Sequence, residues 1–69
     1  MAAGLNAVNR EVIRGMVMGG EDEKEVKKMI SQLVRYDGWD FQKNLNFVRE
    51  LAANGYPQTA KHLAEYISN

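Results

Sequence analysis

The sequence predicts an all-α fold of four short helices, packed as two helical hairpins into a small bundle. Two observations support this prediction. Apolar residues recur at helical spacing in four separate segments, whereas no segment shows the sustained alternation of apolar and polar residues that is typical of a half-buried strand. Glycines also follow the first and third segments, at Gly19-Gly20 and at Gly55. Because glycine reaches the left-handed conformation of a helix terminus at little cost, both positions predict the turn of a hairpin.

The first predicted helix runs from about residue 5 to residue 18, and Asn6 or Asn9 is expected to cap its start. A short polar side chain there accepts a hydrogen bond from the first free backbone amides. One apolar stripe is expected to face the core. It consists of Leu5, Val8, Val12, Ile13, Met16 and Val17.

The second predicted helix covers about residues 22–36 and ends at Asp37-Gly38. Asp22 followed three residues later by Glu25 resembles a capping box, in which each residue satisfies an amide of the first turn. The buried stripe is predicted to consist of Val26, Met29, Ile30, Leu33 and Val34. The basic residues of this segment lie mostly off that stripe.

The third helix is predicted over residues 41–54, with Asp40 as its N-cap, and the fourth over residues 57–68. Pro57 suits the first helical position, because its φ is already helical and no hydrogen bond is lost there. The third helix carries a stripe of Phe41, Leu45, Val48 and Ala52, which Phe47 and Leu51 widen. The residues expected to face inward on the fourth helix are Ala60, Leu63, Ala64 and Ile67.

A single small helical domain over residues 1–69 follows from these four segments. Its predicted core is Val12, Ile13, Met16, Val26, Ile30, Leu33, Leu45, Val48, Leu51, Leu63 and Ile67. A chain of this length buries only about 60% of the surface that its unfolded form exposes. We therefore expect support from self-association or from a partner.

The composition argues against most chemistry. The chain has no cysteine and one histidine, His62, so neither a disulfide framework nor a cysteine- or histidine-rich metal site is expected. His62 has no second histidine and only Glu65 as a nearby acid in sequence, so it is expected to be exposed and without a catalytic role. The acidic run at residues 21–25 is explained by the start of a helix. We predict no enzyme activity, no cofactor and no small-molecule substrate.

No apolar run approaches the roughly 18 residues needed to cross a bilayer, so no membrane association is expected. The first residues also lack the basic region and apolar stretch of a signal peptide. A cytoplasmic protein is the resulting expectation.

Nucleic-acid binding is one possible function. Lysine plus arginine equals aspartate plus glutamate at nine each, so the chain carries no overall polyanion-binding field. A basic stripe is still possible on the second helix, made of Lys24, Lys27, Lys28 and Arg35. A small dimeric DNA-binding regulator would use this stripe, or the start of the fourth helix, on a duplex.

Protein binding is favoured by large apolar residues that exceed what so small a core encloses. The candidate interface residues are Met18, Trp39, Phe41, Phe47, Leu51 and Tyr56. Methionine adapts to irregular partners, and tryptophan and tyrosine are frequent anchors of interfaces.

Residues 45–63 resemble the LisH (lissencephaly-homology) motif. The positions that carry this resemblance are Phe47, Leu51, Gly55, Tyr56, Thr59, Ala60 and Leu63. Glu50 stands where the family often has an aromatic residue, and Pro57 is not characteristic of it. The resemblance implies a helical hairpin that dimerises and serves as a scaffold.

The sequence therefore predicts a non-catalytic protein-interaction module, expected to be a homodimer and to act as a small regulator or adaptor. The alternatives are the DNA-binding regulator described above and an inhibitor that masks a surface of a larger protein.

Overall fold

The computed structural model describes all residues 1–69 and contains four α-helices. These are α1 (Ala7–Met18), α2 (Glu23–Leu33), α3 (Phe41–Ala53) and α4 (Pro57–Ser68). The predicted all-α fold is confirmed, and every predicted helix is found with its ends within three residues of the expected ones. The chain has no strand, only an isolated antiparallel bridge between Gly4 and Arg35.

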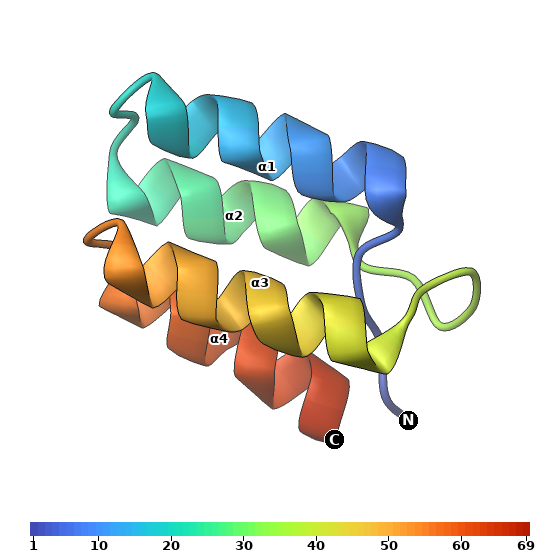
Figure 1. Cartoon of the computed structure of the whole chain (residues 1–69). Coiled ribbons are helices and arrows are strands. Elements are labelled where there is room, and N and C mark those ends of the chain that lie inside the picture. The colour runs from blue at the N-terminus through green and yellow to red at the C-terminus, as the bar shows by residue number, and fades with distance from the viewer.

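The helices form two antiparallel hairpins that pack against each other. α1 and α2 make the first hairpin and α3 and α4 the second, while α4 also packs against α2 (Figure 1). α1 therefore lies at the edge of the bundle. An extended segment before α1 crosses the end of the bundle, and both chain termini lie at that end (Figure 1).

Two of the three predicted helix caps are present. The Asn6 side chain accepts a hydrogen bond from the Asn9 amide at 2.8 Å, and the Asp40 side chain accepts one from the Lys43 amide at 2.8 Å. The predicted capping box of α2 is wrong, because Asp22 makes no side-chain hydrogen bond to the helix.

The first turn of α2 is instead tied to α4. The Glu23 carboxylate accepts hydrogen bonds from the Thr59 amide at 2.9 Å and from the Thr59 hydroxyl at 3.3 Å. A carboxylate at the start of α2 thus satisfies an amide of the first turn of α4. This contact fixes the two helix starts side by side.

α2 ends earlier than predicted because the chain pairs with the N-terminal segment. Val34 is extended, and Arg35 exchanges two backbone hydrogen bonds of 2.9 Å with Gly4. The Ala3 amide also donates to the Tyr66 carbonyl at 3.0 Å, so the first residues contact both α4 and the end of α2.

The core contains most of the residues predicted for it. Six of them are buried: Ile13, Val26, Ile30, Leu51, Leu63 and Ile67. Four others are partly buried against these: Met16, Leu33, Leu45 and Val48. Val12 is the exception, since 43% of its surface is exposed.

The predicted stripe of α1 was too wide for one face. At about 100° per residue, Val8 and Val17 point about 180° apart around the helix. Ile13 enters the core with Met16 and Val17 beside it, so Val8 and Val12 face outward.

The two largest buried residues outside the predicted core are Phe47 and Leu5. Phe47, expected at an interface, is 2% exposed, and Leu5, expected on the buried stripe of a helix, is fully buried within the extended N-terminal segment. Leu5 is held there by Asn44 of α3, which is also fully buried. The Asn44 side chain accepts from the Leu5 amide at 2.8 Å and donates to the Leu5 carbonyl at 2.9 Å and the Asp40 carbonyl at 2.8 Å.

Candidate functional site

The outer face of α1 is the first candidate interaction surface. It is formed by exposed residues that helical spacing places on one side: Ala7, Val8, Glu11, Val12, Gly15 and Met18. Val8 is 71% exposed and Met18 81% exposed. Glu11 is the only charged residue of this face.

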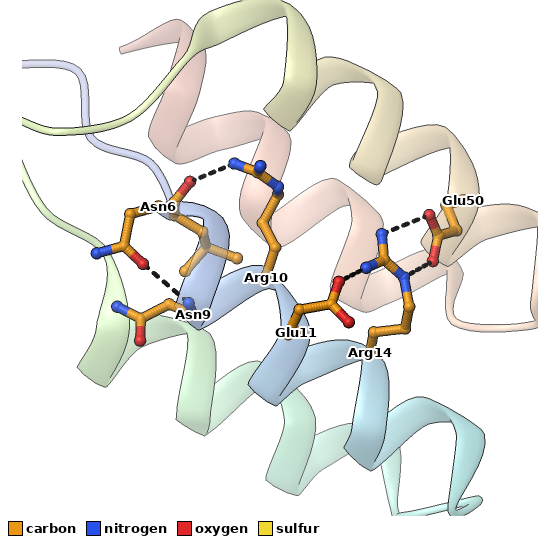
Figure 2. Close-up of polar contacts among 7 residues, drawn as sticks. Asn6, Asn9, Arg10, Glu11, Arg14 and Glu50 are labelled. Atoms are coloured by element: carbon orange, nitrogen blue, oxygen red, sulfur yellow. Dashed lines mark hydrogen bonds and ion pairs between the residues drawn. The ribbon is translucent and has the colours of Figure 1, made fainter.

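Polar contacts on its flanks hold α1 in one orientation. The Asn9 side chain donates to the Leu33 carbonyl of α2 at 3.3 Å, and the Arg10 guanidinium donates to the Leu5 carbonyl at 3.1 Å. Figure 2 shows these side chains together with Arg14, which points to Glu50 of α3. Because these bonds fix the rotation of α1 about its axis, the apolar outer face stays turned away from the bundle.

Arg14 joins the two hairpins through a paired contact. Its Nε donates to one Glu50 oxygen at 2.6 Å and its Nη2 to the other at 2.9 Å, and its Cζ lies 5.1 Å from the centroid of the Phe47 ring. The hydrogen bond raises the pKa of Arg14 and lowers the pKa of Glu50, against the opposing effect of burial. Arg14 also contacts Glu11, so the one charge on the outer face of α1 is offset in part (Figure 2).

We expect Glu50→Gln to reduce the free energy of unfolding by about 1 kcal/mol, near the upper end for a partly exposed pair, because the two-point geometry is lost. Chemical denaturation at neutral pH measures this loss. Since the pKa of Glu50 is lowered by folding, the contribution is present above the ordinary glutamate value near 4.5 and fades as the pH falls below it.

The matched control for this prediction is Glu21→Gln, because Glu21 is exposed and forms no ion pair. Equal stability losses in the two variants at neutral pH would show that the paired contact with Arg14 contributes nothing.

Gly15 lies near the middle of the outer face of α1. A Cβ atom added there would meet nothing within 4 Å, so no contact inside the chain requires glycine. Glycine inside a helix is less favourable than alanine by about 1 kcal/mol. A small residue at this position therefore has no structural reason within one chain, whereas the close approach of another backbone would provide one.

The six predicted interface residues do not form one surface. Met18 lies on the outer face of α1, and Phe41 is 53% exposed at the start of α3. Trp39 and Tyr56 are partly buried against the core; the Trp39 ring nitrogen donates to the Tyr36 carbonyl and the Tyr56 hydroxyl to the Glu21 carbonyl.

The interface prediction is wrong for Phe47 and Leu51, because both lie inside the core of a single chain. Val8 and Val12, predicted for the buried stripe of the first helix, are exposed instead. The width of that stripe could have revealed this, because one face of a helix at the edge of a bundle cannot bury all of its residues.

The basic hollow is the second candidate surface, and it lies between α2 and α4. We define it by the residues Lys24, Lys27 and Lys28 of α2 and Lys61 and His62 of α4. Three of the four predicted nucleic-acid contacts thus lie together with residues of the fourth helix. Arg35 does not join them, because it follows the end of α2 and pairs with Gly4.

His62 lies at the centre of the basic hollow and is half-buried, not exposed as predicted. Its Nε2 lies 2.7 Å from the Ser31 hydroxyl, and the Tyr66 ring meets its ring edge-to-face at a centroid distance of 5.1 Å. Burial lowers the pKa of His62, the Lys27 charge lowers it further, and Glu65 opposes both. The Ser31–His62 contact has no local sequence signal, because 31 positions separate the two residues.

Comparison with known protein families, curated proteins and solved structures finds no match to this chain. Membership of the LisH family therefore stays a prediction. No helix combines the length and the apolar character that crossing a bilayer requires. No group of three or more histidine or acidic side chains is placed to hold a metal ion.

Proposed function

We propose that this protein is a non-catalytic interaction module that forms a homodimer through the outer face of α1, and that it acts as a small regulator or adaptor. The observation that supports this proposal is the exposure of Val8, Val12 and Met18 around a glycine that the chain itself does not need. Several large apolar residues exposed on one helix of a small protein are typical of a contact site.

A second copy fits this face by shape. In an antiparallel pair of α1 helices related by a two-fold axis near Ile13, Val12 of each copy lies opposite Gly15 of the other. The same axis places Val8 opposite the C-terminal end of α1, near Met18. A two-fold contact repeats the valine–glycine pairing, so a valine fills the space above a glycine twice.

Charge on the outer face of α1 is limited to Glu11. Arg14 contacts both Glu11 and Glu50, so its single positive charge offsets the Glu11 carboxylate only in part. The rest of the face is uncharged, so it suits an apolar surface such as its own copy better than a strongly acidic partner.

The size of the face sets the expected affinity. A standard interface buries about 800 Å² per partner, which would be about a fifth of the 4254 Å² that this chain exposes. α1 has 12 residues and is only about 18 Å long, so its contact is smaller than the standard interface. We expect a reversible dimer in the micromolar range.

Analytical ultracentrifugation across a concentration series tests this proposal. Val8→Lys is expected to weaken dimerisation by about ten-fold or more, because it places a charge in an apolar contact, while the fold survives at a position that is already exposed. The matched control is Phe41→Lys, which changes an exposed apolar residue outside the outer face of α1. A dimer lost with Phe41→Lys and kept with Val8→Lys would place the interface elsewhere, and a monomer at all concentrations would refute self-association.

A further inference from the structure

We infer that the basic hollow between α2 and α4 is a binding site for a phosphate monoester group. The surface is shallowly concave on both sides of His62. One side is a hollow of about 190 Å³ lined only by polar residues: Lys27, Gln58, Lys61, His62 and Glu65. The other, of about 420 Å³, continues along α2 past Lys24, Lys28 and Ser31.

No lysine of this site forms an ion pair within the chain. Both ion pairs of the protein involve Arg14, so Lys24, Lys27, Lys28 and Lys61 have no acidic partner within 4 Å. Lys27 lies close enough to His62 to disfavour its protonated form. Like charges brought together by two different helices repel, and a bound anion removes that repulsion.

The two carboxylates of the site limit what kind of anion it takes. Glu25 lines the α2 side of the surface and Glu65 the α4 side. A nucleic-acid backbone presents a continuous row of phosphates and would meet these carboxylates on either side. A single compact dianion between Lys27, Lys61 and His62 stays clear of Glu25 and meets only Glu65, against three cationic or protonatable groups. Lysines act as point charges toward phosphate, and the Gln58 amide and the protonated imidazole add donors.

Binding must change the protonation of His62. The groups that face its ring are Ser31 and Lys27 from α2 and Lys61, Glu65 and Tyr66 from α4. A dianion among the cations favours the charged imidazolium, so the bound state takes up a proton. The pKa of His62 is therefore expected to rise when phosphate binds.

Nuclear magnetic resonance titration with inorganic phosphate tests this inference, using the full chain at constant ionic strength set with chloride. We expect saturable shifts at amides around Lys27 and His62 and an upward shift of the His62 titration midpoint. Lys27→Gln combined with Lys61→Gln is expected to weaken binding by about ten-fold, because two point charges are lost. The matched control Lys43→Gln, on α3, is expected to bind as the unmodified protein does.

Three further ligands distinguish the source of the phosphate group: a small phosphorylated sugar, a phosphoserine peptide and a short DNA duplex. Saturable binding of the sugar or the peptide with loss in the double variant supports the inference and identifies the source. Non-saturable shifts with phosphate, an equal loss in Lys43→Gln, or tighter binding of the duplex than of any monoester overturns it. The Val8→Lys variant is expected to be monomeric and to bind phosphate as the unmodified protein does. The phosphate result therefore does not depend on whether the proposed dimer forms.

Discussion

Asn44→Ala is expected to lower the free energy of unfolding by about 3 kcal/mol. Asn44 is fully buried and makes three hydrogen bonds of 2.8–2.9 Å to backbone groups of Leu5 and Asp40. Alanine leaves the Leu5 amide buried without a partner, at a cost of about 1–3 kcal/mol, and creates a small cavity as well. The Leu5 carbonyl loses the hydrogen bond from Asn44 but still accepts one from the Arg10 guanidinium, so it stays partly satisfied.

The matched control is Asn46→Ala, which makes the same substitution two residues along α3. Asn46 is exposed, and its side chain accepts only from Gln42 at 3.1 Å. We expect a change within about 0.5 kcal/mol for this variant. Chemical denaturation of both variants measures the difference, and equal losses would show that the buried amide does not hold the N-terminal segment.

Gly4→Ala is expected to cost about 2 kcal/mol by overpacking. A Cβ atom at Gly4 would lie 2.3 Å from Cε3 and 2.5 Å from Cδ2 of the Trp39 ring. Both neighbours of this contact are held, Gly4 by its backbone pairing with Arg35 and Trp39 by its bond to the Tyr36 carbonyl. Either the ring or the N-terminal segment must move, and such rearrangements typically cost about 1–3 kcal/mol.

Trp39 is the only tryptophan, so its fluorescence reports the displacement directly. We expect a shift of the emission maximum together with the loss of stability. Gly15→Ala is the matched control, because the same methyl group there meets open space, and it is expected to stabilise the monomer by about 1 kcal/mol. Unchanged emission and stability in Gly4→Ala would contradict the close contact.

Helix positions were predictable because their signals are local. Asn6 and Asp40 cap α1 and α3 as expected, and Gly55, with a φ of 88°, ends the turn before Pro57. Each of these signals depends on residues within one turn of the helix. The hairpin turns were predictable for the same reason, because their glycine signals are also local.

The contacts between segments were not predictable in this way. Asparagine is usually exposed, so the burial of Asn44 was not expected. It is explained by the hydrogen bonds of Asn44 to the backbone of Leu5, which lies 39 positions away in the sequence. Glu23 looked like part of a helix start, yet it binds Thr59 of α4. Val8 and Val12 fitted a buried stripe, but α1 lies at the edge of the bundle and buries only one side. The candidate surfaces depend on such contacts between segments. Several of their residues could be named from the sequence, but which of them lie together could not be predicted.

The pairing of the N-terminal segment has a consequence for the order in which contacts form during synthesis. Residues 3–5 are made before Arg35, Asn44 and Tyr66, with which they form hydrogen bonds. The α3–α4 hairpin closes between neighbouring segments, whereas residues 3–5 complete their pairing only after Tyr66 has been made. These contacts are therefore late ones, and residues 3–5 stay without their partners while the helices in between are synthesised.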